Sequence, residues 1–260
     1  MAEQNPLPGN WPTKAQSASV TLYHMDAGHH REAAMWHDAD HKAEVIASVP
    51  NIFISQRWVT PQDWIRLRPP SELREGGGEY VNVYWSSGTA DELSSDFGRL
   101  GTDLASAGRM DTVRYMHLCW PTGGGNFKMR PVHFAPRPGL PISAAAVTAS
   151  TAMTGLVAVV AMGPGRGDFD RWYKGEYLPK VLATNLFAGA AVLSVGPEAD
   201  TYMTLLYLDS ANPADDYVEY REHLRAWGSE PNGVPDAWAG HTTTFETVAR
   251  PSIGHYNFYD

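Results

Sequence analysis

The segment Trp36-His37-Asp38-Ala39-Asp40-His41 decides the fold, because a related segment, Trp172-Tyr173-Lys174-Gly175-Glu176-Tyr177, follows it 136 positions later. Apolar runs with the composition of β-strands precede both copies, over residues 20–25 and 155–162. Self-similarity at a fixed offset indicates a repeated structural unit. The sequence therefore predicts a tandem duplication.

The predicted elements follow the same order in both halves. In half one, strands are expected over 20–25, 52–59, 80–86 and 113–120, with a first helix from the Trp36 motif and a second over 89–107. In half two, strands are expected over 155–162, 187–195, 202–208 and 241–248, with helices from Trp172 and over 213–228. Each half thus reads β-α-β-β-α-β, and the predicted fold class is α+β, with two fused ferredoxin-like modules.

The first helix and the strand after it resemble a known family. Trp36 precedes the acidic-His pair Asp40-His41, and the next strand contains Gln56-Arg57. This pattern is similar to the dimeric α/β-barrel superfamily, particularly its EthD-like branch, over residues 17–120 and 150–249. The resemblance implies that the two modules face each other through their sheets and close one barrel within the chain. The superfamily includes cofactor-free cyclases and isomerases, monooxygenases, haem enzymes and proteins with no known activity.

The expected domain organisation is a first module over 17–120, a linker over 121–151, a second module over 152–249 and a tail over 250–260. The linker is expected on the surface because it is rich in Gly and Pro, including Gly123-Gly124-Gly125. The tail is aromatic and is expected to pack on the protein. Exposed outer strands and this tail favour a homodimer.

The composition limits the kinds of partner that the protein is expected to bind. A net charge of −9 argues against nucleic acid or an anionic membrane surface, which both need a basic partner. Cys119 is the only cysteine, and the first sixteen residues have no apolar signal core, so a cytoplasmic location is expected. The charge-free run over 142–162 approaches the length of a membrane span, but its hydroxyl residues and its position favour the opening strand of module two.

Polar and aromatic side chains distinguish half one from half two. The strands of half one carry His24, Gln56, Arg57, Trp58, Asn82, Tyr84, Tyr115 and His117, whereas the corresponding strands of half two are mostly apolar. Half one is therefore the predicted active module and half two a scaffold. His24, Arg57, Trp58, Asn82 and Tyr115 are candidate substrate-binding residues.

Strand alternation assigns these residues to faces. Val81, Val83 and Trp85 are expected to meet the helices, and Tyr80, Asn82, Tyr84, Tyr115 and His117 to line the barrel interior. His117 is the candidate general base, Tyr84 the donor to an oxyanion and Asn82 the group that orients a carbonyl. The alternative is that His117 is a hydrogen-bonded core histidine that links strands.

His41 is a second candidate base, with Asp40 as its orienting partner, because the resemblance places an acidic-His pair there. An α-helical projection puts it at the edge of a core stripe formed by Met35, Ala39, Ala43, Ile46 and Val49. His37, His41 and Glu44 also have the spacing of metal ligands. Their face lies opposite the stripe, as a solvated face would, so no metal is predicted.

The strand-to-strand connection over 60–79 is the third sign of a site in half one, because its counterpart over 196–201 is much shorter. Long connections in compact domains are often functional lids. Trp64, Arg66 and Arg68 are candidate substrate contacts, and Gly76-Gly77-Gly78 is a candidate hinge.

These features predict a cofactor-independent enzyme for an apolar aromatic or polyketide-like small molecule. The expected reactions are cyclisation, isomerisation, elimination or retro-aldol cleavage, as in a lyase, isomerase or cyclase. One alternative is a haem-dependent dehydratase or peroxidase with His117, His133 or His241 as axial ligand. Another is a non-catalytic stress protein that binds a small molecule.

Overall fold

The computed structural model describes residues 13–69, 79–118, 126–149, 152–162, 171–194, 201–227 and 242–252. Its strands are β1 (Ser17–Met25), β2 (Ile52–Val59), β3 (Tyr80–Ser86), β4 (Met116–Leu118), β5 (Asn126–Pro136), β6 (Gly155–Met162), β7 (Phe187–Ser194), β8 (Thr201–Leu208) and β9 (Thr242–Pro251). Its helices are α1 (His30–Met35), η2 (Trp36–His41), α2 (Lys42–Ser48), α3 (Gln62–Ile65), α4 (Ala90–Ser106), η3 (Asp111–Tyr115), α5 (Ala144–Ala149), η4 (Tyr173–Tyr177), α7 (Leu178–Leu182) and α8 (Pro213–Ala226).

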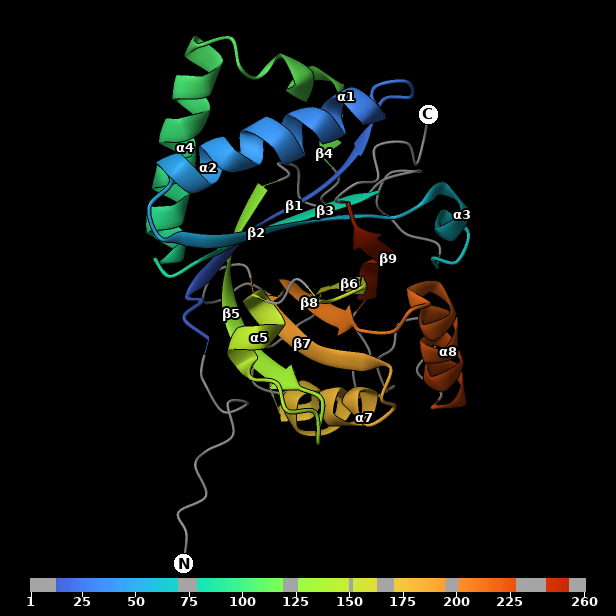
Figure 1. Cartoon of the computed structure of the whole chain (residues 1–260). Helices are drawn as coiled ribbons and strands as arrows, with labels where there is room; N and C mark the ends of the chain where they lie inside the picture. Colours follow the sequence, from blue (N-terminus) through green and yellow to red (C-terminus); the bar gives the residue numbers. More distant parts are fainter. Residues whose placement is uncertain are drawn as a thin grey trace, which may run out of the picture.

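The strands form one closed antiparallel barrel built from two ferredoxin-like sheets. Half one has the order β4-β1-β3-β2 and half two the order β9-β6-β8-β7, so corresponding strands occupy corresponding places. Pairing of β2 with β9, and of β5 with both β1 and β7, joins the sheets into a ring. In Figure 1, α1, α2 and α4 cover the outer face of one sheet and α7 and α8 that of the other. The predicted fold class is confirmed.

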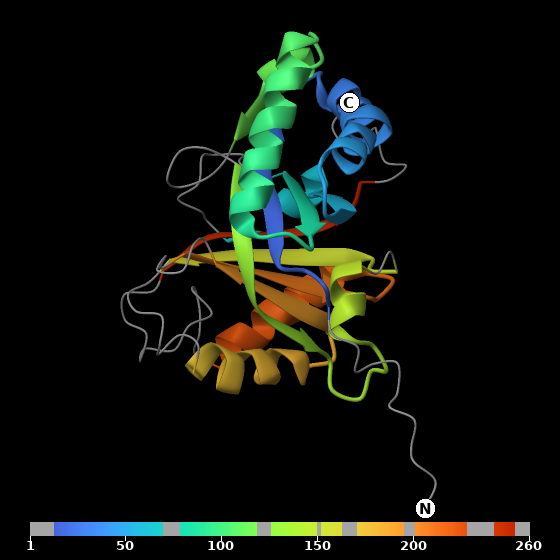
Figure 2. The ribbon, with the colours of Figure 1, turned by 90° about the vertical axis from the view of Figure 1, so that its left-hand side faces the viewer.

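The expected surface linker over 121–151 contains regular structure that connects the two sheets. Strand β5 pairs first with β1 and then with β7, and α5 follows it. Its prolines were misleading, because Pro131 lies beside a bulge in the β5–β7 register, where a strand tolerates a missing N–H donor. Figure 2 shows β5 running from one layer to the other.

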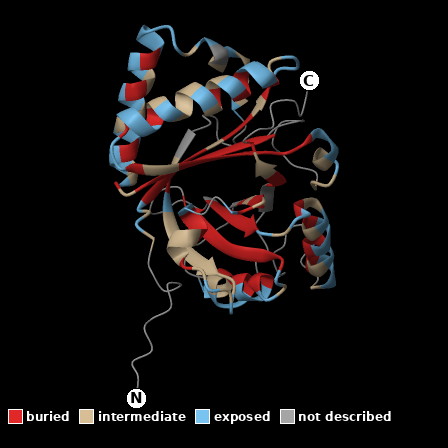
Figure 3. Ribbon diagram, viewed as in Figure 1, coloured by how far each residue is buried: buried red, intermediate tan, exposed pale blue. Residues whose placement is uncertain are grey.

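The predicted faces of half one were reversed. Val81, Val83 and Trp85 are buried between the two sheets, in a core shared with Leu156 and Leu205 of half two. Tyr84 instead packs under the helices with Val45, Leu93 and Leu100. Sheet-on-sheet packing requires the more apolar face inside the barrel, and this leaves the polar face for the helices. Figure 3 shows the buried strands between outer helices that expose one side.

Smaller differences affect the edges of the fold. The expected strand over 113–120 begins later, because Asp111–Tyr115 forms a 3-10 turn before β4. The expected tail begins inside β9, with Arg250 and Pro251, and residues 253–260 lie outside the described residues. The run over 142–162 contributes to α5 and β6. No helix in the described part of the chain is long and apolar enough to cross a membrane.

Candidate active site

The repeated motif forms a π-helical turn in both halves, over Trp36–His41 and Tyr173–Tyr177. A π-helical turn adds a residue to the helical repeat and turns the following side chains away from their α-helical phase. The predicted core stripe was wrong: Met35 and Ile46 are exposed, and His37 is buried with 2% of its surface accessible, in α-helical phase with the buried Ala33 and Ala34. Such turns occur frequently at functional sites.

His37 is held at three points in the space between the helices and the sheet. Its Nε2 lies 2.8 Å from Asn82 Nδ2 and 3.1 Å from the Tyr84 hydroxyl, both on β3. Its Nδ1 lies 3.2 Å from Asp38 Oδ1. The carboxylate fixes the proton on Nδ1, so the Nε2 lone pair accepts from the amide or the phenol.

Asp38 connects His37 to a buried cation. Arg57 Nη1 donates to Asp38 Oδ2 at 2.9 Å, and the Ser252 hydroxyl donates to the same oxygen at 3.1 Å. Arg57 Nε donates to the Tyr23 hydroxyl, and the guanidinium stacks over the Tyr80 ring. Burial alone would raise the pKa of Asp38, but the hydrogen bond from His37 and the charge of Arg57 hold that pKa below its ordinary value.

Both histidines of the motif are neutral at pH 7. Burial lowers the pKa of His37 to about 4, and burial likewise lowers the pKa of His41 to about 4. The His41 ring stacks on Trp36 with 4.4 Å between centroids. A neutral imidazole can accept a proton, and the neighbouring Asp38 carboxylate stabilises the imidazolium that results.

A cavity of about 240 Å³ opens beside His37. Its polar lining groups come from β1, β3 and η2, and most of its apolar lining groups come from α4 and the η3–β4 segment. The residues are Thr21, Trp36, His37, His41, Asn82, Tyr84, Phe97, Leu100, Gly101, Leu104, Met110, Val113, Met116 and Leu118. An apolar cavity with a few convergent polar groups is the usual form of a small-molecule site.

The same positions in half two are filled by tyrosines. Tyr173 and Tyr177 stand where half one has His37 and His41, and both are buried. The Tyr173 hydroxyl donates to Thr204 on β8 at 2.6 Å, and Tyr177 and Tyr220 share a hydrogen bond of 2.9 Å. The larger phenol side chains pack into the apolar core of that half, between its helices and sheet. Among the described residues, the motif side chains therefore line a cavity in half one and pack into a core in half two.

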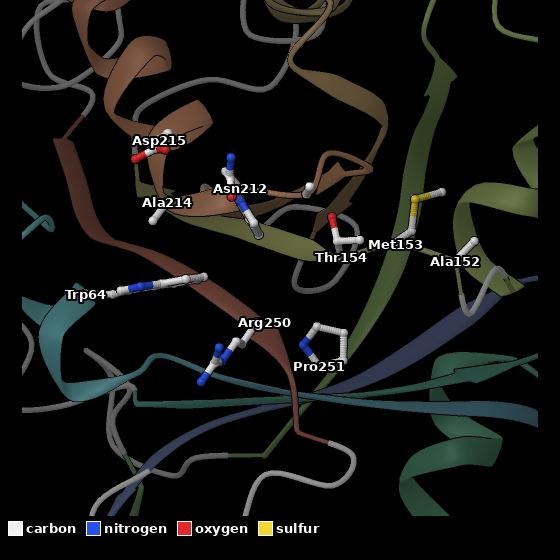
Figure 4. Close-up of a pocket in the computed structure, with 11 residues that line it drawn as sticks. Trp64, Ala152, Met153, Thr154, Asn212, Ala214, Asp215, Arg250 and Pro251 are labelled. Carbon is white, nitrogen blue, oxygen red and sulfur yellow. The ribbon is translucent and has the colours of Figure 1, made fainter.

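A larger cavity of about 550 Å³ lies where α3, the start of α8 and the end of β9 meet. Figure 4 shows Trp64 and Arg250 on one side and Asn212 and Asp215 on the other. Its described lining contains no histidine or tyrosine; the other lining residues are small, apolar or hydroxylated. The smaller cavity is the better candidate for chemistry because its groups converge on one buried imidazole.

The structure brings together only part of the predicted site. Tyr84 and Asn82 meet at one point as expected, but at His37 rather than His117. His117 lies on β4, where its Nε2 contacts Asp26 at 2.7 Å and its ring stacks on His24. Tyr115 stacks on His29. These residues lie at the β1–β4 edge, because β4 pairs with the end of β1, beyond its pairing with β5.

The other predicted site residues have different neighbours from those that the sequence suggested. Trp58 is buried in the core between the sheets, near Tyr207. Arg57 contacts Asp38 and Tyr23, so it holds Asp38 in place and does not itself line the cavity. Asp40 pairs with Arg109 at the surface and does not orient His41. His41 itself lines the cavity.

The described part of the predicted lid, residues 60–69 and 79, does not line this cavity. The described part of the 60–79 connection packs against half two, where Trp64 contacts its core and the Thr60 hydroxyl hydrogen-bonds to Thr247 of β9 at 2.6 Å. Arg68 also reaches Thr247. Gly76-Gly77-Gly78 lies outside the described residues. Arg66 does not line either cavity.

Sequence reasoning missed His37 as the central group. It appeared only as a member of the metal-spaced set with His41 and Glu44, on a face taken to be solvated. Among the described residues, no group of three His, Cys, Asp or Glu side chains is arranged to hold a metal ion. The available signal was the motif itself, because His37 and His41 are the two positions at which half two substitutes tyrosine.

Comparison with known proteins supports the fold. Neither a protein-family model nor a curated protein sequence matches the chain. Among solved structures, an anthrone oxidase-like protein matches with a TM-score of 0.59 and 10% identity over 91% of each chain. A putative monooxygenase from Fusobacterium nucleatum matches with a TM-score of 0.51 and 7% identity over 91% of each chain. A dye-decolorizing peroxidase from Bacteroides thetaiotaomicron matches with a TM-score of 0.50 and 8% identity over 96% of each chain.

These likenesses confirm the dimeric α/β-barrel fold, and the EthD-like branch stays a prediction. They also correct one expectation. The prediction of no cofactor is contradicted, because a dye-decolorizing peroxidase shares this fold. DypB from Rhodococcus jostii matches with a TM-score of 0.50 and 10% identity over 96% of this chain and 97% of that chain.

The described residues nevertheless do not fit a haem. The cavity at His37 is smaller than the ~300–1,000 Å³ typical of pockets for drug-sized ligands, and Nε2 of His37 already contacts Asn82 and Tyr84. The described lining of the larger cavity has no His, Tyr or Cys to bind iron. His117 and His133 line neither cavity, and His241 lies outside the described residues. No step is therefore assigned to haem.

Proposed function

We propose that the chain is a small-molecule enzyme that removes a proton from a small aromatic ketone or phenol in the cavity at His37. The observation that carries this proposal is the buried, neutral His37 imidazole, with Nδ1 held by Asp38 and Nε2 in contact with Asn82 and Tyr84, which line the same largely apolar cavity. The site residues of the prediction change accordingly. His37 is the base, Tyr84 and Asn82 are its partners, and Asp38 is the positioning residue.

The proposed mechanism follows from the three contacts of His37. The acidic group of the substrate displaces both the Tyr84 hydroxyl and the Asn82 amide N–H from Nε2, and Nε2 takes the proton. The Tyr84 hydroxyl, released from the imidazole, then donates to the developing oxyanion. Burial raises the pKa of Tyr84, so the phenol stays protonated and can act as this donor. Asp38 stabilises the imidazolium, and Arg57 keeps Asp38 ionised.

The substrate class is supported by the lining and by one similar structure. Apolar side chains cover most of the cavity, and its modest volume suits a compact ligand. The anthrone oxidase-like neighbour is named for an aromatic ketone. In such a ketone the carbonyl acidifies a C–H bond, so proton removal by a base is the step that His37 can perform. Subsequent isomerisation or oxidation of the carbanion is compatible with the same first step.

The experiment measures proton removal directly. The protein is incubated in deuterated water with 2-tetralone or anthrone, and deuterium uptake by the ketone is followed by mass spectrometry. His37→Gln should lower the rate of enzyme-dependent exchange by roughly 10²–10⁴-fold. His223→Gln, a change at an exposed histidine of α8, is the matched control and should leave the rate unchanged.

A second pair of variants tests the location. Gly101 lines the cavity, and a Cβ added to it would meet no other atom within 4 Å, so Gly101→Leu should fill the cavity and abolish exchange. Gly98→Leu, on the exposed side of α4, should not. Ketone binding without exchange would favour a non-catalytic binding protein, and full exchange in Gly101→Leu would place the site elsewhere.

A further inference from the structure

Three residues that line the cavity at His37 carry a buried polar atom with no hydrogen-bond partner among the described residues: Asn82 Oδ1, Trp36 Nε1 and His41 Nδ1. The His41 Nδ1 lies 3.7 Å from Glu44 Oε2 and is therefore turned toward that carboxylate. The other two atoms have no such neighbour, although Asn82 is only 4% exposed. Buried polar groups in native proteins nearly always have a partner, so these two atoms indicate groups that a ligand supplies.

The orientation of the Asn82 amide follows from the contacts of His37. Asp38 Oδ1 lies 3.2 Å from the His37 Nδ1, so Nδ1 carries the proton and Nε2 is an acceptor. A donor must therefore face Nε2, and this donor is the Asn82 Nδ2 at 2.8 Å. Turning the amide over would place its oxygen against the Nε2 lone pair, so Oδ1 points away from the imidazole. Because Oδ1 can only accept, its missing partner is an O–H or N–H group.

Trp36 carries the complementary group beside the candidate base. Its ring stacks on His41 with 4.4 Å between centroids and meets the His37 ring at an angle of 72°, with 6.4 Å between centroids. The indole N–H can only donate, so its missing partner is an acceptor. A carbonyl oxygen has two lone pairs, one for Trp36 and one for the Tyr84 hydroxyl that donates to it in the proposed mechanism.

We propose that the substrate is a small aromatic ketone that also carries a phenolic hydroxyl group, an inference that rests on the proposed function. The hydroxyl group donates to Asn82 Oδ1, and the carbonyl oxygen accepts from Trp36 Nε1. The aromatic ring contacts the apolar lining from α4 and the η3–β4 segment. A site that hydrogen-bonds a hydroxyl group discriminates against the analogue without it, because the acceptor then stays buried and unpaired.

The test is calorimetric titration of the unmodified protein with 2-tetralone, with its ring-hydroxylated isomers and with the corresponding fluoro compounds. Fluorine is close to a hydroxyl group in size but has no proton to donate. At least one hydroxylated isomer should bind roughly tenfold more tightly than 2-tetralone, and its fluoro counterpart should not. This comparison needs no variant, so it does not depend on the folding of one.

Single substitutions then assign the affinity to residues. Trp36→Phe removes the N–H and keeps an aromatic ring, so both 2-tetralone and the hydroxylated isomer should bind roughly tenfold more weakly. Trp172→Phe, at the equivalent position of half two, is the matched control and should change neither affinity, because Trp172 lines neither described cavity. Asn82→Leu should remove the preference for the hydroxyl group, with circular dichroism as the check on folding.

Two results would overturn the inference. One is equal affinity for 2-tetralone and for its hydroxylated and fluoro derivatives, and the other is equal affinity of Trp36→Phe and Trp172→Phe for the hydroxylated isomer. Tight binding of a hydroxylated isomer without deuterium exchange would refute the proposed proton removal alone. Exchange of all the ketones without any preference in affinity would refute this inference alone, and absence of binding by every compound would refute both.

Discussion

The imidazole of His37 links the candidate chemistry to stability. Its pKa is lowered to about 4 in the folded protein, against about 6.5 in an unfolded chain. Between these values the unfolded state binds more protons, so the free energy of unfolding falls as the pH falls from about 7 toward 4. His37 should contribute roughly 2 kcal/mol of this loss by pH 5.

Urea unfolding at pH 7.5 and pH 5 measures this effect. His37→Gln should lose less stability between the two pH values than the unmodified protein does, because Gln does not titrate. His223→Gln should show the same loss as the unmodified protein. An equal loss in His37→Gln would show that His37 is not buried in its neutral form.

The Asp38–Arg57 pair provides a second prediction at this scale. Both side chains are nearly inaccessible, with 1% of Arg57 and 8% of Asp38 exposed. Asp38→Asn leaves the guanidinium buried without its counter-charge, which typically costs about 3–5 kcal/mol. We expect the free energy of unfolding at pH 7.5 to fall by about that amount. Asp96→Asn breaks the ion pair with Arg99 at the surface and should change the free energy of unfolding by less than about 1 kcal/mol. Equal losses of stability in Asp38→Asn and Asp96→Asn would contradict a buried ion pair between Asp38 and Arg57.

These residues show how far the sequence could predict the site. Strand alternation correctly predicted that Asn82 and Tyr84 lie on the same face of β3. Their partner was not predicted, because the expected stripe was drawn through Met35, Ala39 and Ala43, whereas the buried face of the helix runs through His30, Ala33, Ala34 and His37. The face itself was assigned wrongly, since alternation separates two sets of residues without showing which set the helices cover.

At the scale of elements, Gly155 allows α8 to pack on β6. A Cβ at Gly155 would lie 2.5 Å from the Pro213 Cβ and 2.9 Å from the Leu208 Cδ1. Gly155→Ala should therefore push the start of α8 away from the sheet and destabilise the protein by about 1–3 kcal/mol. Gly98→Ala lies at an open position inside α4 and should stabilise it by about 0.5–1 kcal/mol. Thermal unfolding measures both. A neutral Gly155→Ala would contradict the close approach of these elements.

Element prediction succeeded where the pattern was local. Strands β2, β3 and β6 have the bounds that their apolar runs predicted. Strand β5 was missed because Pro131 and Pro136 argue locally against a strand, although its register depends on two distant partners. The existence of β5 follows from barrel closure, and closure is not visible in any short window of sequence.

At the scale of the whole molecule, the two halves share one core and two strands that pair with both sheets. The inner faces of both sheets pack in a single apolar cluster that includes Val83 and Trp85 of half one and Leu156 and Leu205 of half two. Strands β5 and β9 each pair with both sheets. Neither half can bury its inner face alone, so we expect the two halves to unfold as one cooperative unit.

The last prediction tests this cooperativity. Leu205 is fully buried on β8 of half two, and Leu205→Ala should lower the free energy of unfolding by about 2–5 kcal/mol. Because the core is shared, the most protected amides of β3 in half one should lose as much hydrogen-exchange protection as those of β8 do. Exchange measured by mass spectrometry at pH 7 compares the two strands within one molecule. Loss confined to half two would mean that the modules unfold independently, and the cavity at His37 would then depend on the stability of half one alone.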